Sequence, residues 1–146
     1  MREGGKILEE VLDITIASVR PGITLAHLDH IAEQEILKRG AYPSFKKVPG
    51  YTWTICACVN EVVVHGIPDE YVIKEGDVVG IDCGVYCKGF HTDAAWTIRV
   101  QSPKERGKDA VDTFLSVGVK ALYLGIEKVK AGNHIYDISK AVEDTV

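Results

Sequence analysis

The fold is decided by Gly76-Asp77-Val78-Val79-Gly80-Ile81-Asp82-Cys83-Gly84-Val85-Tyr86, an alternating stretch rich in strand-forming residues. The turn-forming residues Cys87-Lys88-Gly89 follow, and a second run of strand-forming residues extends from Phe90 to Val100. Alternation of this kind on both sides of a short glycine-containing turn is typical of a β-hairpin. The sequence therefore predicts two antiparallel strands joined by a tight turn.

The register of this hairpin brings two acidic residues together. With Cys87-Lys88 as a two-residue loop, Asp82 pairs directly with Asp93, and paired residues point to the same face of a sheet. Like charges in such a pair repel each other unless a cation bridges them or one carboxyl holds a proton, which indicates a divalent metal site. A three-residue loop centred on Lys88 would shift the pairing unless a bulge restored it, and two ordinary polar residues on a solvated strand are the alternative interpretation.

A histidine lies upstream of the hairpin. The segment Val59-Asn60-Glu61-Val62-Val63-Val64-His65-Gly66-Ile67-Pro68 is interpreted as a strand that closes on His65 beside a glycine and proline turn. A histidine in that position either has a chemical role or is structural, with its ring hydrogen-bonded to a backbone carbonyl. Together, this segment, Gly76 to Asp82, and Gly89-Phe90-His91-Thr92-Asp93 resemble the type I methionine aminopeptidase family.

That resemblance implies an α+β, pita-bread (creatinase/aminopeptidase) fold, in which helices flank an antiparallel sheet that carries two divalent metal ions. It implies that Asp82 and Asp93 are metal ligands and that His65 is catalytic, contacting the substrate near the scissile bond. It also places Cys56 in the substrate pocket, with Tyr51 as the expected pocket aromatic. The metals are cobalt, manganese, iron or zinc, which a carboxylate-rich site with one histidine accommodates alike.

The chain departs from the family pattern after Asp93. The family has three further ligands there, a histidine in a Gly-His-Gly context and two glutamates, as well as a second catalytic histidine. Here only His134, Glu105, Glu127 and Glu143 follow, in other contexts. We therefore expect residues 1–146 to be a single, C-terminally incomplete catalytic domain, the N-terminal portion of a longer enzyme with the second half of its fold incomplete, and inactive alone.

The implied function is removal of the initiator methionine from the N-terminal peptide of nascent proteins. A proline peptidase of the same fold and a catalytically dead pita-bread binding module are the alternatives. The net charge of −4 argues against a nucleic-acid partner. The sequence has no run of about 18 apolar residues and no signal-peptide pattern, so it indicates neither membrane insertion nor secretion. A cytoplasmic location is expected, and the ribosome is a candidate partner that the sequence leaves open.

Apolar spacing and capping residues predict four helices. They are expected at residues 3–19, from a Thr24 N-cap to Gly40, from a capping box at Ser102-Pro103-Lys104-Glu105, and from an Asn133 N-cap. Residues 41–54 are expected to form an aromatic loop beside the substrate pocket. The four cysteines are interpreted as buried reduced thiols on strands, with Cys56 and Cys58 on one face of their strand and Cys83 on the face opposite to Asp82.

Overall fold

The computed structural model describes residues 1–101 and 109–146, which divide into two compact units, Met1–Gln101 and Ser102–Val146. The elements of the first unit are α1 (Arg2–Ala17), α2 (Leu25–Lys38), β1 (Tyr42–Pro43), a 3₁₀ turn η1 (Phe45–Lys47), β2 (Ile55–Val59), β3 (Val78–Cys87) and β4 (Phe90–Arg99). Those of the second unit are α3 (Ala110–Glu127) and α4 (Ile135–Glu143). The prediction that the chain forms one domain stays a prediction.

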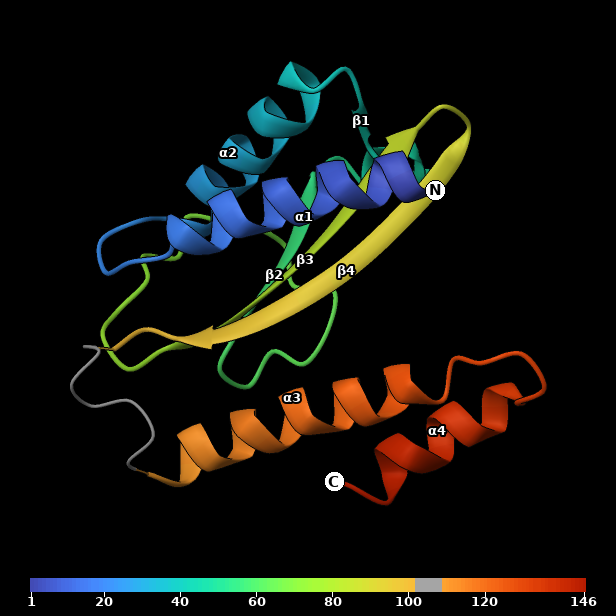
Figure 1. Ribbon diagram of the computed structural model, residues 1–146. Coiled ribbons are helices and arrows are strands. Elements are labelled where there is room, and N and C mark those ends of the chain that lie inside the picture. The colour runs from blue at the N-terminus through green and yellow to red at the C-terminus, as the bar shows by residue number, and fades with distance from the viewer. Residues whose placement is uncertain (102–108) are drawn as a thin grey trace. The chain divides into compact units, whose positions relative to one another are not determined.

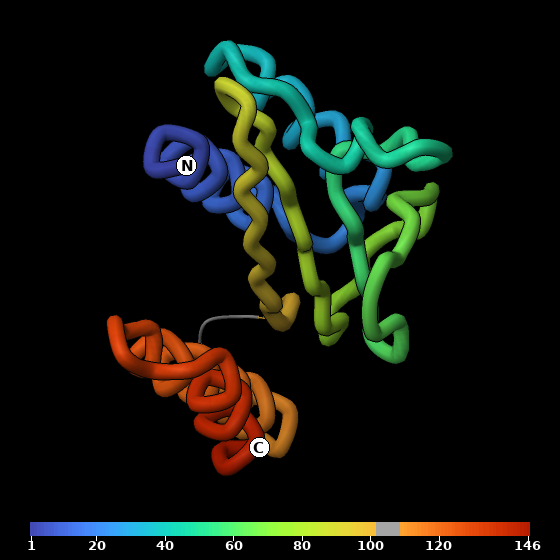
Figure 2. Tube along the Cα trace, turned by 90° about the vertical axis from the view of Figure 1, so that its right-hand side faces the viewer, coloured from blue at the N-terminus to red at the C-terminus, as the bar shows by residue number. Residues whose placement is uncertain are grey.

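Strand β3 is the centre of the sheet in the first unit (Figure 1). Strand β4 pairs with one edge of β3, while β2 and the short β1 pair with the other edge, and every pairing is antiparallel. Helix α1 lies along the β3–β4 hairpin (Figure 1 and Figure 2) and approaches it closely at Gly4, beside Cys87 and Thr92. The predicted α+β class, an antiparallel sheet with flanking helices, is confirmed.

The hairpin turn differs from the prediction by one residue at each end. Its central residues are Lys88 and Gly89, both with positive φ (49° and 89°), and Cys87 pairs with Phe90. Such a turn matches the twist of the flanking strands and favours glycine at its second central position. Cys87 is 8% exposed and packs in the core, so it belongs to the strand. The predicted Cys87-Lys88 loop is therefore wrong.

The two faces of the sheet have different surroundings. Side chains at odd positions of β3, together with alternate residues of β2, pack against α1 and α2 in a core that is almost fully buried. Its members include Leu8, Val11, Leu28, Ile36, Ile55, Ala57, Val79, Ile81, Cys83 and Val85. The even positions of β3 point to the other face, as strand alternation requires. That second face carries the acidic residues.

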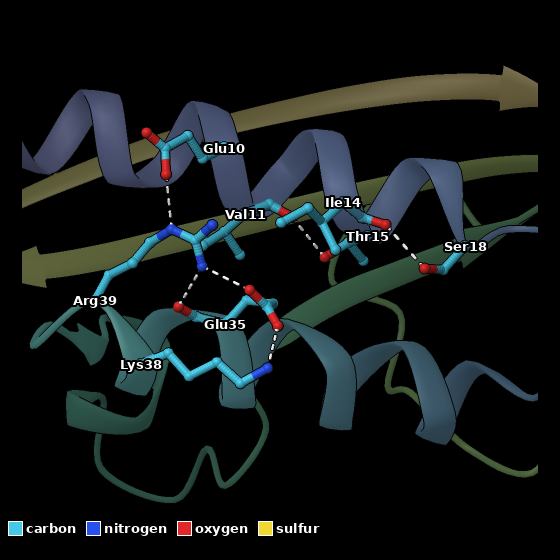
Figure 3. A network of polar contacts seen from close by, with 8 residues as sticks. All are labelled: Glu10, Val11, Ile14, Thr15, Ser18, Glu35, Lys38 and Arg39. Carbon is cyan, nitrogen blue, oxygen red and sulfur yellow. Dashed lines mark hydrogen bonds and ion pairs between the residues drawn. The ribbon is translucent and has the colours of Figure 1, made fainter.

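Helices α1 and α2 begin and end close to their predicted limits. The Thr24 hydroxyl caps α2 by accepting from the His27 amide at 3.1 Å, and Gly40 follows the helix with a φ of 69°. Figure 3 shows Arg39 joining the two helices, because its guanidinium donates to Glu10 of α1 at 2.8 Å and to Glu35 of α2 at 2.6 Å. The Arg39–Glu10 pair is exposed and the Arg39–Glu35 pair is partly buried, and both supplement the apolar contact between the helices.

The strand predicted to close on His65 ends earlier. Strand β2 stops at Val59, and Asn60 turns the chain away with a φ of 54°. Val62, Val63 and Val64 are 44%, 86% and 66% exposed, outside any strand. Their strand propensity is not expressed because Val59 pairs with Val79, and β3 begins only one residue before that, at Val78, so a longer β2 would run past its partner strand.

The second unit is a helical hairpin. The Asp109 side chain caps α3 by accepting from the amides of Val111 and Asp112, whereas the predicted capping box at residues 102–105 lies outside the described residues. Helix α4 has His134 rather than Asn133 as its N-cap, and the His134 amide donates to Asp137 at 2.7 Å. Among residues 1–101 and 109–146, no helix combines the length and the apolar character needed to cross a membrane.

Candidate functional site

Asp82 and Asp93 share the face of the sheet opposite to α1, but they are not directly paired. Asp93 pairs with Gly84 and Asp82 pairs with Ala95, which corrects the predicted Asp82–Asp93 pairing. The shift amounts to two residues on one strand, so it preserves the face on which each side chain lies. The two carboxyls are therefore diagonal neighbours, and Asp93 lies close enough to raise the pKa of Asp82.

The carboxyl of Asp82 is in an unfavourable environment for a charged group. Burial, together with the hydrogen bond and the repulsion from Asp93, raises the pKa of Asp82 to about 6, against a smaller opposing effect of His65. One carboxyl oxygen, Oδ1, is buried and has no hydrogen-bond partner. A buried acceptor without a donor costs free energy of folding, so the site suits a bound group that supplies positive charge.

These two residues fit part of a divalent metal site. Paired carboxylate oxygens, one of them unpartnered, are the donors that hard and borderline divalent ions take. Within residues 1–101 and 109–146, no group of three or more histidine, cysteine, aspartate or glutamate side chains is arranged to hold a metal. The described residues thus bring together two candidate metal ligands, Asp82 and Asp93.

His65 lies on the long connection after β2 in a conformation that non-glycine residues rarely adopt. Its φ is 55°, and the next residue, Gly66, packs directly against β2, where a Cβ would come within 2.2 Å of the Ala57 carbonyl oxygen. The Ala57 amide donates to the Gly66 carbonyl at 2.9 Å. Glycine at position 66 is therefore a steric requirement for seating His65, and strained backbone of this kind is concentrated at functional sites.

The predicted site residues all line one hollow of about 460 Å³ in the first unit. Its lining comprises Phe45, Val48, Tyr51, Cys56, His65, Ile67, Asp82 and Asp93. Apolar and aromatic side chains thus form the wall, and the histidine and the two carboxyls are its chemical groups. An apolar hollow with a few convergent polar groups is the usual form of a small-ligand or side-chain pocket.

Tyr51 and Cys56 form a hydrogen-bonded part of this wall. The Tyr51 hydroxyl donates to the Ile55 carbonyl at 2.7 Å and lies 3.2 Å from the Cys56 sulfur. Burial raises the pKa of both the Tyr51 hydroxyl and the Cys56 thiol, so both groups are neutral at physiological pH. Cys56 pairs with Asp82 across β2 and β3, which places the thiol beside the carboxyl.

Asp29, which the sequence patterns did not predict as part of the site, supports this wall from α2. Its carboxylate, 9% exposed on α2, accepts from the amides of Thr54 and Ile55 at 2.7 and 3.0 Å, which holds the start of β2. Burial raises the pKa of Asp29, although the two amide hydrogen bonds act in the opposite direction. A detectable signal existed, because Asp29 falls within the apolar face Leu25, Leu28, Ala32 and Ile36 of the helix.

Within the loop expected beside the pocket, Phe45 and Val48 line the hollow together with Tyr51, the aromatic that was singled out. The segment that carries them rests on the sheet at Gly84, where a Cβ would come within 2.8 Å of the Ser44 side chain and 2.7 Å of the Phe45 ring. The Ser44 hydroxyl and the His91 Nδ1 atom are 2.7 Å apart. Loop placement of this kind depends on contacts between distant segments, so local sequence carries little signal for it.

An α+β fold whose antiparallel sheet carries an acidic pair facing an apolar hollow is the arrangement of the pita-bread metallopeptidases. The chain belongs to metallopeptidase family M24, because the sequence model of that family matches residues 1–146. Membership of a metallopeptidase family implies divalent metal ions as cofactors.

Known relatives agree with this assignment. A methionine aminopeptidase of Clostridium perfringens (strain 13 / Type A) is 43% identical over 100% of this chain and 57% of its own length. The crystal structure of a methionine aminopeptidase from Thermotoga maritima has a TM-score of 0.90 and 33% identity, over 100% of this chain and 57% of that one. An Xaa-Pro dipeptidase from Bacillus anthracis has a TM-score of 0.82 and 25% identity, over 98% of this chain and 38% of that one.

These comparisons confirm the resemblance to methionine aminopeptidases and the pita-bread fold. The chain spans somewhat more than half the length of the methionine aminopeptidases that it matches.

Proposed function

We propose that this chain supplies one wall and two metal ligands of a methionine aminopeptidase, which removes the initiator methionine from nascent polypeptides as part of a longer enzyme. The observation that carries the proposal is the Asp82 carboxyl, whose buried oxygen lacks a partner beside Asp93 in an apolar hollow. The relatives named methionine aminopeptidase support the choice of substrate.

The proposed metal ligands are Asp82 and Asp93, and the proposed occupants are two divalent ions, cobalt, manganese, iron or zinc. Bound metal would polarise the scissile carbonyl and activate water for its hydrolysis. Because two carboxylates cannot define the geometry of two ions, we propose that the remaining ligands lie outside this chain and that residues 1–146 alone are inactive.

The substrate would be held by the chain's own residues. The wall formed by Tyr51 and Cys56, both neutral, suits the uncharged thioether side chain of an N-terminal methionine. His65 faces the same hollow, so its imidazole would orient the scissile amide or its leaving nitrogen by a hydrogen bond. The catalytic role of His65 and the substrate-binding roles of Tyr51 and Cys56 are parts of this proposal.

The partner is therefore the N-terminal peptide of a nascent protein, and the proposed compartment is the cytoplasm. All four cysteines lie within the described residues and are free thiols, which agrees with a reducing compartment.

Methionine release from a Met-Ala-Ser peptide tests this function. We expect release by a longer enzyme that contains residues 1–146, loss of release in Asp93→Ala, and full release in the control Asp13→Ala, whose carboxyl is exposed on α1. Residues 1–146 alone should release no methionine. Turnover by residues 1–146 that Asp93→Ala abolishes would show that the proposed need for outside ligands is wrong.

The structural likeness to an Xaa-Pro dipeptidase favours a proline peptidase as the second candidate. The higher identity to a methionine aminopeptidase, 43% against 25%, supports the first. Hydrolysis of an Xaa-Pro peptide in preference to Met-Ala-Ser would reverse this choice.

A further inference from the structure

The connection between β2 and β3, residues 60–77, carries His65 and is here called the His65 loop. Near its middle, Gly66 is bonded to β2, because its carbonyl accepts from the Ala57 amide and its amide donates to the Cys58 sulfur at 3.4 Å. His65 itself has a φ of 55°, which the surrounding structure must maintain. The imidazole is therefore carried by a loop that is fixed at Gly66 and at the two points where it leaves β2 and enters β3.

Both ends of the His65 loop meet at one carboxylate. Asp77, 7% exposed, accepts at Oδ1 from the Asn60 side-chain amide at 3.0 Å. At Oδ2 it accepts from the Tyr71 hydroxyl at 3.0 Å and from the Lys74 backbone amide at 2.8 Å. Asn60 precedes His65 and Tyr71 follows it, so a single side chain joins the segments on either side of the histidine.

Each partner of Asp77 is itself anchored. The Asn60 side-chain oxygen accepts from the Val78 amide at 3.0 Å, so both ends of this amide group are used, and Asn60 holds a φ of 54° that asparagine tolerates. The Tyr71 carbonyl accepts from the Leu25 amide at 3.1 Å at the start of α2. Asp77 thus connects the turn after β2 to the helix layer.

We propose that Asp77 is a positioning residue for His65, which closes the His65 loop through Asn60 and Tyr71 and so holds the imidazole in the hollow that contains Asp82 and Asp93. The functional meaning of this positioning rests on the proposed role of His65, but the structural coupling does not. Asp77 does not line the hollow and touches no reacting group.

A pair of substitutions tests the coupling. Asp77→Asn keeps the shape of the side chain but places an NH₂ group against either the Asn60 amide or the Lys74 N–H, which are both donors. Adding Asn60→Asp reverses the polarity of the pair. In this double variant the carboxylate at position 60 accepts from Val78 and from the amide at position 77, whose oxygen accepts from Tyr71 and Lys74.

The readouts are the NMR signals of the His65 imidazole and the hydrogen exchange rate of the Gly66 amide in the purified protein. We expect Asp77→Asn to shift the imidazole signals and speed Gly66 exchange about tenfold or more, and the double variant to restore both. Val11→Ala, in the buried core of α1, serves as the control for lost stability and should leave the His65 signals unchanged. Should Asp77→Asn fail to fold, Tyr71→Phe removes one bond of the same group and should produce a smaller change of the same kind.

Unchanged His65 signals in the Asp77 and Tyr71 variants would overturn the proposal. So would a double variant that stays as perturbed as Asp77→Asn, or an equal change in Val11→Ala. Peptide hydrolysis by the longer enzyme separates this inference from the proposed function. Restored His65 signals without methionine release would leave the positioning role standing and the aminopeptidase proposal refuted.

Discussion

Two aspartates, five residues apart, show how the same side chain serves opposite purposes in two regions of the first unit. At the closure of the His65 loop, both oxygens of Asp77 accept hydrogen bonds from three donors. In the hollow, Asp82 has a buried oxygen with no donor and a second carboxyl, Asp93, beside it. The difference lies in the donors that the fold provides, not in the residue type.

The pKa values of the two groups reflect this contrast. Burial acts to raise the pKa of Asp77, but the bonds from Asn60, Lys74 and Tyr71 lower it below its ordinary value of 3.8. Burial and Asp93 raise the pKa of Asp82 to about 6. A fully bonded carboxylate stabilises the fold, whereas an unbonded one retains binding capacity for a ligand.

The largest expected effect is on metal binding. In a longer enzyme that contains this chain, Asp82→Ala or Asp93→Ala should weaken divalent ion binding by about 100-fold or more, because a proposed ligand is lost. Asp77→Ala should change it far less. Isothermal titration calorimetry with Mn²⁺ measures both, and equal losses in all three variants would erase the contrast between the two regions.

The second effect is on stability. Asp77→Ala leaves three donors of the His65 loop without their acceptor, so we expect it to lower the free energy of unfolding by about 2–4 kcal/mol. Asp82→Ala removes a carboxyl that is poorly solvated and repelled, and metal-free protein should lose little or no stability. Urea denaturation of both variants gives the comparison, and a greater loss in Asp82→Ala would contradict it.

The third effect is on the pH dependence of stability in metal-free protein. Because the folded protein holds the Asp82 proton more tightly than the unfolded chain, the stabilising contribution of Asp82 is complete below pH 3.8 and is lost as the pH rises through about 6. That of Asp77 is present above pH 3.8 and is lost as the pH falls through its lowered pKa. In urea titrations from pH 3 to 8 with a chelator, the loss of stability between pH 3.8 and about 6 should be absent in Asp82→Asn. The loss of stability below pH 3.8 should be absent in Asp77→Asn.

The smallest effect tests, at a second residue of the hollow, whether hydrogen bonding decides if a polar group stabilises the fold or binds a ligand. Tyr51 lines the hollow with Asp82, but its hydroxyl is bonded to the Ile55 carbonyl. Tyr51→Phe should therefore behave like a structural change, lowering the free energy of unfolding by about 1 kcal/mol and leaving Mn²⁺ affinity unchanged. A marked loss of metal affinity in this variant would show that position in the hollow, rather than hydrogen bonding, decides the role.

Much of the first unit was predictable from local patterns. Helices α1 and α2 follow from apolar spacing and from Thr24 as a cap, and the β3–β4 hairpin follows from alternation around Lys88-Gly89. The turn itself was misplaced because the burial of Cys87, which depends on α1, decided which residues join the strand. The strand expected at Val62–Val64 failed because β-propensity does not by itself provide a partner strand, and β3 begins only one residue beyond the position that pairs with Val59.

What the sequence alone determined about this protein is that Asp82 and Asp93 lie on one face of a hairpin. Side chains alternate between the faces with a period of two, so an error of two residues in the register leaves each side chain on the same face. It also indicated the family, through the segments around His65, Asp82 and Asp93. Only the tertiary structure decided which carboxylates find donors. Asp77 accepts from Asn60, 17 residues away, and Asp29 accepts from Thr54, 25 residues away, and contacts over such separations are set by packing rather than by local pattern.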